Sequence, residues 1–405
     1  MNGRGGIRRR EFLQGGVAAT LGAAGLPLSS RAASPGVRSY RRLGRTGLEI
    51  SDISFGSSRT TDPRIVEHAF DRGINYFDTA ESYRGGAAEN AIGKALGGGK
   101  REEVTLASKV AARRRTSADE LMHALEGSLR RLQTDRIEIY FNHAVNDAGR
   151  LDNPEWYEFA ERAKKQGKIR FTGMSGHGGR LAECLEHALD GDLVDVILVA
   201  YNFGQDPRFY EAFMRRFDLV AIQPELPALL EKARASDVGV VAMKTLMGAR
   251  LNDMRPYERN GSTFSQAAFR WVLSNPNVDS LIVSMKRTAD IDEFLVASGS
   301  GSLSGADVGL LERYARRNGS HYCRPGCDAC SGSCPYGVAI SEVLRTRMYA
   351  TDYGDVDYAL EDYARLGAGA NACATCAEQP CLGSCPYGLP IAELTRSAHQ
   401  RLARG

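Results

Sequence analysis

The chain has 405 residues, 43% hydrophobic and 25% charged, which is ordinary for a globular enzyme with one large domain and a smaller one. The formal net charge is only +3, so the basic excess of a nucleic-acid-binding protein is missing and we expect no nucleic-acid partner. Eight of the nine cysteines lie between Cys323 and Cys385, which predicts a local site built from thiols.

Residues 1–34 have the pattern of an export signal. Residues 9–13 read Arg-Arg-Glu-Phe-Leu, and an apolar run at 15–28 is followed by small residues. The Arg-Arg-x-Phe-Leu order resembles the twin-arginine signal of bacteria. The run is shorter than the roughly 20 residues needed to cross a bilayer, so we expect no integral membrane protein. We therefore expect a twin-arginine signal peptide at 1–34 and a periplasmic location, or anchoring by an uncleaved leader; a disordered basic tail is the alternative.

From residue 40 onward the chain alternates strand-like and helix-like segments. A Gly-punctuated hairpin pattern at 41–48 leads into the first of eight short β-type runs. Apolar residues at helical spacing fill the stretches between them, for example at 118–132 and 265–273. Eight strand–helix units in about 250 residues predict an α/β fold, a closed (β/α)8 TIM barrel over residues 40–298. The runs are expected at 50–55, 75–79, 104–108, 137–141, 169–174, 194–199, 238–243 and 280–283.

An open, doubly wound sheet is the alternative architecture. It normally carries a Gly-rich phosphate turn after its first strand, whereas residues 56–59 read Gly-Ser-Ser-Arg. Residues 97–101, Gly-Gly-Gly-Lys-Arg, lack the Ser or Thr of a phosphate loop and predict a helix end instead. The barrel therefore remains the expected fold.

Four polar residues stand at the ends of successive predicted strands. Asp78, Lys109 and His143 end the second, third and fourth runs, and Tyr83 follows Asp78 by one short loop. In this type of barrel, functional residues gather at the carboxyl ends of the strands. Neighbouring strands lie about 4.8 Å apart, so we expect these side chains to converge.

The four groups fit general-acid chemistry on a carbonyl. A phenol titrates near pH ~10, and an adjacent ammonium favours the phenolate, so Lys109 would lower the pKa of Tyr83. Asp78 would keep Lys109 charged, and His143 would hydrogen-bond the oxygen that Tyr83 protonates. Taken singly, an Asp–Lys pair is usually a salt bridge and a lone His a core residue. Together, the four predict an active site for hydride addition to C=O.

Several of these motifs resemble the aldo-keto reductase family. They are Leu-Gly-Arg-Thr-Gly-Leu at 43–48, Phe-Asp-Thr-Ala-Glu-Ser-Tyr at 77–83, Glu89, Gly-Lys-Ala-Leu at 93–96, Ala-Ser-Lys at 107–109 and the run ending at His143. The resemblance spans roughly residues 40–297. It implies an oxidoreductase that uses NADP(H) or NAD(H) on a small carbonyl or sugar-like substrate, with the tetrad Asp78, Tyr83, Lys109 and His143. Gly-Met-Ser-Gly-His at 173–177 and Met-Lys-Thr-Leu at 243–246 resemble the subgroup with a C-terminal iron–sulfur domain.

The nucleotide-binding positions implied by this resemblance depart from the family pattern. Leu198 replaces the glutamine that usually holds the nicotinamide carboxamide, and Asp290 and Phe294 replace the Arg and Asn that usually grip the 2′-phosphate and adenine. Ser-Gly at 175–176 replaces the usual Ser-Asn, and Val-Ser at 283–284 replaces Pro-Gly. The predicted cofactor-binding residues are Ser175, Asn202, Ser284 and Lys286.

The C-terminal cysteines form two similar motifs. The first is Cys-x3-Cys-x2-Cys-x3-Cys-Pro and the second is Cys-x2-Cys-x4-Cys-x3-Cys-Pro. Bacterial ferredoxins show Cys-x2-Cys-x2-Cys-x3-Cys-Pro, and the fourth cysteine of one motif ligates the other cluster. We therefore predict a linker at 316–320, then a small α-helical ferredoxin-like iron–sulfur domain at 320–405, with helices near 341–349 and 355–366, two [4Fe–4S] clusters and a redox partner. The predicted ligands are Cys323, Cys327, Cys330, Cys334, Cys373, Cys376, Cys381 and Cys385.

Alternatives remain open for the thiols and for the function. Four disulfides would suit an exported protein, and two four-thiolate zinc sites also fit. The function could be that of an exported carbonyl oxidoreductase, an iron–sulfur electron-transfer protein whose barrel binds a partner or sugar without NADPH turnover, or a non-catalytic binding module stapled by zinc or disulfides. The complete tetrad favours the first. The insert at 203–217 is expected to shape the pocket, and His177 lies on the same predicted rim.

Overall fold

The computed structural model of the chain describes residues 36–178, 180–205, 223–246, 254–258, 261–318, 323, 327, 329–351, 356–366 and 371–403. The predicted leader at 1–34 and most of the insert at 203–217 lie outside the described residues. In the part of the chain that is described, no helix is both long enough and apolar enough to cross a membrane.

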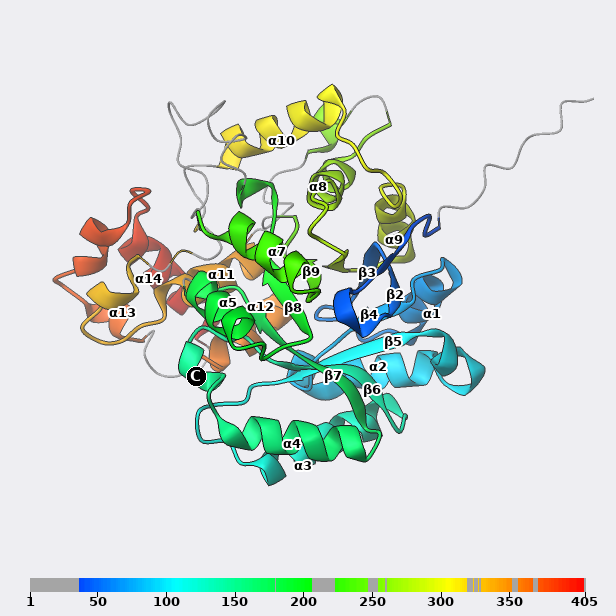
Figure 1. The fold of residues 1–405 in the computed structure, drawn as a ribbon. Helices are drawn as coiled ribbons and strands as arrows, with labels where there is room; N and C mark the ends of the chain where they lie inside the picture. The colour runs from blue at the N-terminus through cyan, green and yellow to red at the C-terminus, as the bar shows by residue number, and fades with distance from the viewer. Residues whose placement is uncertain are drawn as a thin grey trace, which may run out of the picture. The chain divides into compact units, whose positions relative to one another are not determined.

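Eight parallel strands close into a ring in the order β10-β3-β4-β5-β6-β7-β8-β9 (Figure 1). The last strand pairs with the first, with Leu281 opposite Ile53, and this pairing closes the sheet. The predicted (β/α)8 barrel is therefore confirmed. The strands are β3 (Ile53–Gly56), β4 (Tyr76–Asp78), β5 (Thr105–Val110), β6 (Ile137–Asn142), β7 (Ile169–Gly176), β8 (Val196–Ala200), β9 (Gly239–Met243) and β10 (Ser280–Ser284).

A hairpin precedes the barrel, as the glycine pattern predicts. Strands β1 (Tyr40–Arg42) and β2 (Glu49–Ser51) pair antiparallel. Between them Gly44 passes so close to β9 that a Cβ would lie 2.3 Å from the backbone nitrogen of Gly239, so no larger residue fits there. Leu43 of this hairpin is fully buried in the cluster that fills the barrel interior, so the hairpin seals one end of the barrel.

The single strand predicted at 50–55 is wrong: β2 ends at Ser51 and β3 begins at Ile53. The interruption is Asp52, which is fully buried. Its carboxylate accepts hydrogen bonds from the Ser298 hydroxyl at 2.6 Å and from the Gly299 backbone N–H at 2.7 Å. Satisfying this buried carboxylate turns the chain between the two strands.

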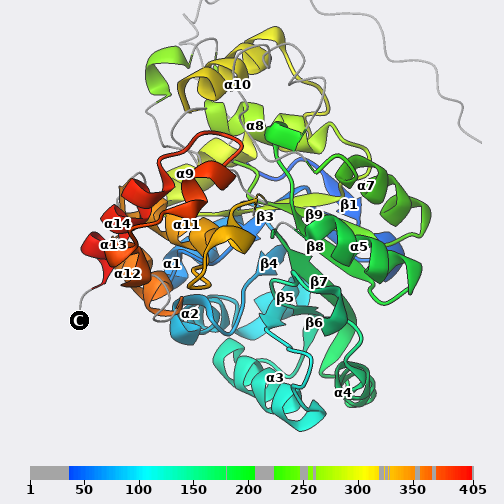
Figure 2. The same cartoon turned by 90° about the vertical axis from the view of Figure 1, so that its left-hand side faces the viewer.

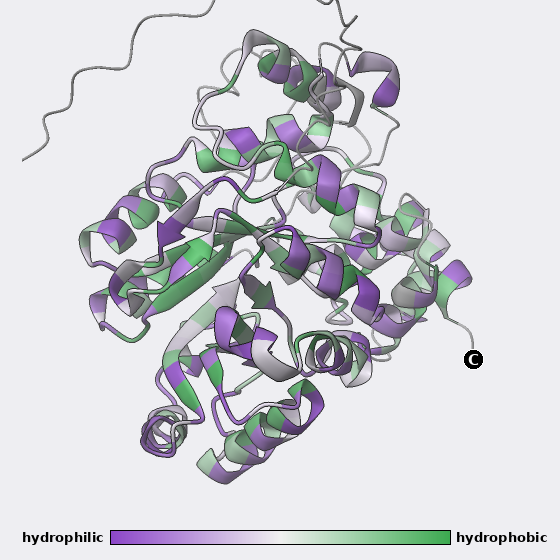
Figure 3. Cartoon of the chain, turned by 90° about the vertical axis from the view of Figure 1, so that its right-hand side faces the viewer, coloured by the Kyte–Doolittle hydropathy of each residue, from purple (hydrophilic) through white to green (hydrophobic). Residues whose placement is uncertain are grey.

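Helices surround the ring of strands; Figure 1 shows α3 and α4 side by side outside β6. Side-chain caps fix several helix starts, and the Ser117–Glu120 and Thr263–Gln266 pairs form capping boxes. Apolar residues gather on the strands and inner helix faces, with polar ones outside (Figure 3). The helices are α1 (Pro63–Asp71), α2 (Ala87–Ala95), α3 (Ala118–Leu132), α4 (Pro154–Lys165), α5 (Leu181–Asp190), α7 (Leu226–Ala235), α8 (Phe264–Leu273), α9 (Thr288–Leu295) and α10 (Gly305–Asn318).

Helix α10 corrects the predicted linker at 316–320, because it continues to Asn318. It is anchored by Tyr314, whose ring stacks on Phe264 of α8 with the centroids 4.3 Å apart. Helical packing, rather than a flexible connection, therefore carries the chain out of the barrel. Residues 319–322 lie outside the described residues.

The C-terminal region is built from short helices around its own small core (Figure 2). The two helices predicted near 341–349 and 355–366 are present. The helices are α11 (Ile340–Thr351), α12 (Val356–Ala364), α13 (Ala372–Thr375) and α14 (Ile391–Leu402). Leu344, Ala359 and Ala398 bring α11, α12 and α14 together in this core.

Candidate active site

Asp78 and Lys109 form a buried ion pair at the ends of β4 and β5. Each side chain is only 1% exposed. The Lys109 ammonium donates to Asp78 Oδ1 at 2.5 Å and to the carbonyl of Thr79 at 2.6 Å. Burial lowers the pKa of Lys109, while the Asp78 charge opposes that shift. The other carboxylate oxygen, Oδ2, has no hydrogen-bond partner among the described residues.

Tyr83 lies on a tight turn between β4 and α2. The turn passes through three consecutive residues with positive φ: Arg84 at 54°, Gly85 at 62° and Gly86 at 90°. A left-handed arginine is uncommon, and such strain concentrates at functional sites. The turn brings the Tyr83 ring centroid within 5.2 Å of the Lys109 nitrogen. The ring also meets the His143 ring edge-on, with the centroids 5.7 Å apart.

His143 follows the end of β6. Its backbone N–H donates to the carbonyl of Val110 at 2.8 Å, which fixes it beside the end of β5. Burial, followed by the nearby Lys109 charge, lowers the pKa of His143 to about 3. A neutral imidazole carries one N–H donor and one acceptor nitrogen at ordinary pH. The four residues predicted as a tetrad are therefore brought together at one mouth of the barrel.

Buried polar groups beyond the tetrad hold the strand that carries Lys109 in place. Glu89 of α2 is fully buried and accepts from the Ser108 hydroxyl at 2.6 Å and from Arg131 Nε at 2.6 Å. Ser108 is the neighbour of Lys109 on β5, so Glu89 ties helix α2 to the strand that carries the lysine. Sequence reasoning used Glu89 only as part of a motif and gave it no role.

Two of the predicted cofactor-binding residues are engaged with the backbone. Ser175 on β7 is 1% exposed, and its hydroxyl accepts from the Ala144 N–H at 2.9 Å. Asn202, after β8, is fully buried; its amide donates to the carbonyl of Lys244 at 3.2 Å and accepts from the Gly204 N–H at 3.0 Å. Both residues lie on the mouth side of their strands, and both shape the backbone there.

The other two lie near the end of β10. Ser284 shares a hydrogen bond of 2.7 Å with the Ser58 hydroxyl, and Lys286 is exposed. Where the family has its adenosine-binding residues, Asp290 is buried in an ion pair with Arg287, and Phe294 is packed edge-on against Phe269. Neither replacement offers the family's contacts.

Leu198 lies in the apolar cluster inside the barrel, where the family glutamine would present an amide. The side chain is fully buried on β8. It therefore packs, and it supplies no hydrogen bond to a carboxamide.

Lys244 and His177 are further polar residues of the mouth, after β9 and β7. Lys244 is a left-handed residue with φ of 56°. Burial, followed by the charge of Arg345, lowers its pKa to about 7. The Lys244 charge and burial hold the pKa of His177 well below its ordinary value. Sequence reasoning placed His177 on the rim and used Lys244 only as part of the Met-Lys-Thr-Leu motif, although a charged residue closing an apolar strand was the available signal for a role.

Helices α11 and α12 reach this rim. The Arg59 guanidinium, after β3, lies 5.5 Å from the ring centroid of Tyr349 on α11. Arg84, next to Tyr83, lies 3.7 Å from Glu361 of α12. The C-terminal region therefore contacts the loop after β3 and the turn that carries Tyr83.

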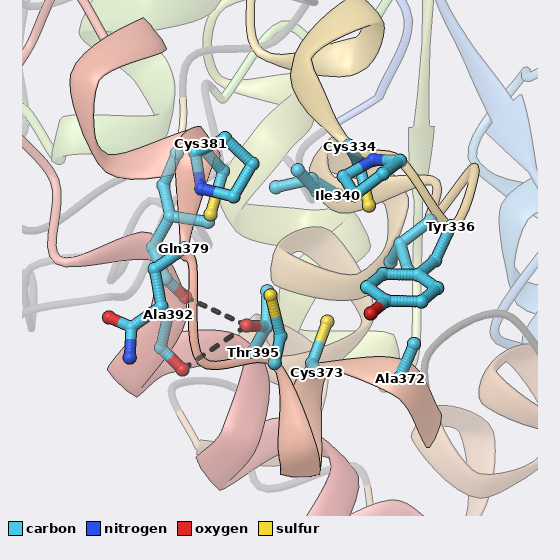
Figure 4. Close-up of a pocket in the computed structure, with 14 residues that line it drawn as sticks. Cys334, Tyr336, Ile340, Ala372, Cys373, Gln379, Cys381, Ala392 and Thr395 are labelled. Carbon is cyan, nitrogen blue, oxygen red and sulfur yellow. Dashed lines mark hydrogen bonds between the residues drawn. The ribbon is translucent and has the colours of Figure 1, made fainter.

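The second motif's first three cysteines gather with the last cysteine of the first motif. Cys334, Cys373, Cys376 and Cys381 line one open hollow of about 390 Å³, and Figure 4 shows the sulfurs of Cys334, Cys373 and Cys381 facing the same space. The Thr395 hydroxyl beside them donates to the carbonyl of Ile391 at 2.9 Å.

Cys330 of the first motif lies near cysteines of both motifs. Burial, followed by the neighbouring Cys327, raises the pKa of Cys330 to about 11, and Cys385 acts on it as well. None of Cys330, Cys334 and Cys385 is in a disulfide, and the same holds for Cys373, Cys376 and Cys381. In the described part of the chain, no three His, Cys, Asp or Glu side chains are arranged to hold one metal ion.

Comparisons with known proteins agree with the barrel. A model of the aldo/keto reductase family matches residues 52–315. The uncharacterized oxidoreductase YrpG of Bacillus subtilis is 29% identical over 298 residues, which are 64% of this chain and 90% of YrpG. L-galactose dehydrogenase of Arabidopsis thaliana is 26% identical over 294 residues, 64% of this chain and 87% of that protein.

Solved structures show the same fold. PA4992 from Pseudomonas aeruginosa, described as an aldo-keto reductase, is 26% identical with a TM-score of 0.52, over 68% of this chain and 100% of its own. The holo form of the aldo-keto reductase AKR11C1 from Bacillus halodurans is 23% identical with a TM-score of 0.52, over 68% of this chain and 95% of its own.

Proposed function

The chain belongs to the aldo/keto reductase family and is an oxidoreductase. We propose that it reduces a small carbonyl compound with Tyr83 as the general acid. The observation that carries the proposal is the contact of the Tyr83 ring with both Lys109 and His143. A bound nicotinamide dinucleotide would supply the hydride. Tyr83 would deliver the proton to the carbonyl oxygen, and neutral His143 would donate a hydrogen bond to the same oxygen.

Substitution of Tyr83 tests this assignment. Tyr83→Phe removes the proton donor and keeps the ring, so we expect turnover of generic aldehydes with NADPH to fall by about 10²–10⁴-fold. Binding of NADPH, measured by fluorescence, should be unchanged, because the phenol acts on the substrate. Unchanged aldehyde turnover in the variant would overturn the proposal.

Ser175, Asn202, Ser284 and Lys286 are proposed to hold the dinucleotide. Family members use NAD(P)H, and the tetrad at the mouth fits a nicotinamide beside it. Asp290 is buried and Phe294 is packed, so the 2′-phosphate lacks its usual partners, and only the exposed Lys286 and Arg287 could meet it, the latter already paired with Asp290. Discrimination between NADPH and NADH should therefore be weak. A dissociation constant for NADPH more than about 100-fold below that for NADH would contradict this.

Two [4Fe–4S] clusters are proposed for the C-terminal region. One would be held by Cys334, Cys373, Cys376 and Cys381, which share a hollow, and the other by Cys323, Cys327, Cys330 and Cys385. This exchange of the fourth cysteine matches the two-cluster ferredoxin pattern. A zinc site needs four thiolates around one ion, whereas each thiolate of a cluster binds a different iron and the sulfurs lie farther apart.

Iron and sulfide analysis of protein purified without oxygen tests the clusters. About eight iron atoms and eight sulfides per chain are expected for two [4Fe–4S] groups. Stoichiometric zinc with no iron would replace this proposal with the zinc alternative.

An electron-transfer role is the second candidate function. It is favoured because the buried Leu198, Asp290 and Phe294 replace the residues that bind the nucleotide in the family. In that case a redox partner would exchange electrons with the clusters, and the barrel would bind a partner or sugar without NADPH turnover. The L-galactose dehydrogenase among the relatives supports a sugar-like substrate for either role. Turnover driven by dithionite, with none from NADPH, would favour this second role.

Export through the twin-arginine route to the periplasm is proposed from residues 9–13. Arg9→Lys together with Arg10→Lys should retain the protein in the cytoplasm of a bacterial host, because the export machinery reads the paired arginines. Periplasmic recovery equal to that of the unchanged chain would contradict the proposal.

A further inference from the structure

Lys244 and His177 give the mouth of the barrel a polar corner that the tetrad does not use. We propose that these two residues bind a carboxylate of the substrate, so that the enzyme acts on acidic carbonyl compounds. The inference deepens the proposed reductase function and rests on it. It assigns to Lys244 the specificity for the end of the substrate that does not react.

The backbone holds Lys244 in an uncommon conformation. Its φ is 56°, a left-handed value that is unfavourable for a non-glycine residue. Two contacts maintain it: the Asn202 amide donates to its carbonyl at 3.2 Å, and the Tyr201 N–H donates to the carbonyl of Met243 at 3.0 Å. A strained residue that its neighbours fix in place at the mouth is typical of a site with a function.

The Lys244 amine has no hydrogen-bond or ion-pair partner among the residues that the structure describes. Two acids lie near it, Glu342 of α11 and Asp362 of α12. Both are already engaged by Arg345, with Asp362 at 3.3 Å, and Asp362 also accepts from the Thr346 hydroxyl at 2.9 Å. A partly exposed ammonium with no partner in the described part of the chain is available to a ligand at the mouth.

The charged groups around this corner pair with one another and leave the Lys244 ammonium without a direct anionic contact among the described residues. Arg345 engages both Glu342 and Asp362, so neither acid contacts the Lys244 ammonium directly, and a substrate carboxylate would be its first direct anionic partner among the described residues. His177 and His143, which face it from the ends of β7 and β6, are neutral because their pKa values are strongly lowered. One ammonium and neutral imidazole donors fit a carboxylate better than a doubly charged phosphate.

The position also places the carboxylate near the reacting group. The charges of Lys244 and Lys109 both lower the pKa of His143. His143 is therefore a neighbour of the polar corner and a member of the tetrad. A carbonyl compound held at one end by Lys244 could reach Tyr83 with the other. Fixing both ends of a substrate converts binding energy into orientation of the carbonyl.

Two aldehydes matched in the ring test the proposal: benzaldehyde and 4-carboxybenzaldehyde, assayed with the full-length holoenzyme. We expect the wild type to favour the carboxylated aldehyde by about tenfold or more in KM, the range of a charge-assisted hydrogen bond. Lys244→Asn should abolish that preference without changing KM for benzaldehyde; Asn tolerates left-handed backbone, so the fold is kept. Lys244→Arg should retain the preference. Lys94→Gln removes an exposed lysine on α2 and should change neither KM.

A binding measurement separates this inference from the reductase function. Calorimetry with 4-(hydroxymethyl)benzoate, the corresponding alcohol, needs no turnover, and affinity should drop about tenfold in Lys244→Asn. Affinity should also fall as pH rises through and above 7, because the ammonium is lost and a bound carboxylate raises its pKa. Lys244-dependent binding without any turnover would sink the reductase proposal alone. Equal KM values for the two aldehydes in wild type and variant, or an effect of the variant on NADPH affinity only, would overturn the carboxylate site.

Discussion

The barrel and the cysteine-rich C-terminal region hold their reactive groups in different ways. In the barrel, Asp78 and Lys109 are 1% exposed, lie on paired strands and satisfy each other at 2.5 Å. In the C-terminal region the thiols sit in 3-10 turns and short helices, partly exposed, around a hollow. The barrel therefore fixes its groups by packing and by their own ion pair, whereas the thiols would be fixed by the clusters proposed above.

The difference in core size supports this contrast. The main core of the barrel runs through all eight strands and the helices around them. The C-terminal core is a small cluster on α11, α12 and α14. A region with so little buried apolar surface generally depends on a metal or disulfides for its stability.

Removal of the proposed clusters should give the largest effect. Structural metal sites contribute on the order of 10 kcal/mol to folding, so chelation under reducing conditions should unfold the C-terminal region. Hydrogen exchange should then show lost protection in α14 and unchanged protection in α3 of the barrel. Restoring iron and sulfide serves as the control. If α14 keeps its protection after all metal is gone, the contrast between the two regions is wrong.

Lys109→Met should have the next largest effect. It leaves the Asp78 charge buried without a partner, and such changes cost about 3–5 kcal/mol in the free energy of unfolding. The double variant Asp78→Leu with Lys109→Met should recover most of this stability, yet both variants should lack reductase activity. Urea denaturation and aldehyde turnover measure the two effects. Lys94→Met, on the exposed face of α2, is the control and should be silent.

Glu361→Gln should have a small effect, because it weakens a half-exposed ion pair at 3.7 Å from Arg84. Such pairs contribute less than about 1 kcal/mol. Since Arg84 adjoins Tyr83, we expect a change in kcat of about twofold with little change in the urea midpoint. Glu378→Gln, on the exposed surface, should change neither. Loss of most activity in Glu361→Gln would show that the C-terminal region is part of the catalytic machinery.

His143 should leave no trace in the pH dependence near its ordinary pKa. Its pKa in the fold is about 3, below the usual value near 6.5, so it is neutral throughout the range of an ordinary assay. The wild-type profile of kcat/KM should therefore show no inflection at pH 6–7 that is due to His143. The profile of His143→Asn should keep the same shape in that range. Because the unfolded chain takes up this proton and the folded one does not, acidification from pH 6.5 toward 3 should destabilise the fold more in wild type than in the variant.

The sequence was sufficient for the barrel and for three members of the tetrad. Asp78, Lys109 and His143 end strands whose side chains alternate faces, so their convergence follows from a period of two and from the common edge of parallel strands. Tyr83 is different, because its placement needs the left-handed Arg84, which no residue preference predicts. The motif pointed to Tyr83, but the turn could only be seen in the structure.

Where sequence reasoning failed, tertiary contacts decided the outcome. The strand predicted at 50–55 is divided because Asp52 bonds Ser298 and Gly299, far away in the chain. The linker predicted at 316–320 is helical as far as Asn318, because α10 packs on α8. Lys244 was noted only within a motif, since the role proposed for it depends on Arg345 having paired with the nearby acids.

The most direct test of the account follows the hydride itself. Purified enzyme is mixed with NADPH deuterated at the transferable C4 position and an aldehyde, and the alcohol is analysed by mass spectrometry. We predict one deuterium per alcohol molecule in the wild type and almost no alcohol from Tyr83→Phe at the same time. Alcohol without deuterium, or equal labelled product from the variant, would contradict the claim that Tyr83, Lys109 and His143 form a carbonyl-reducing site.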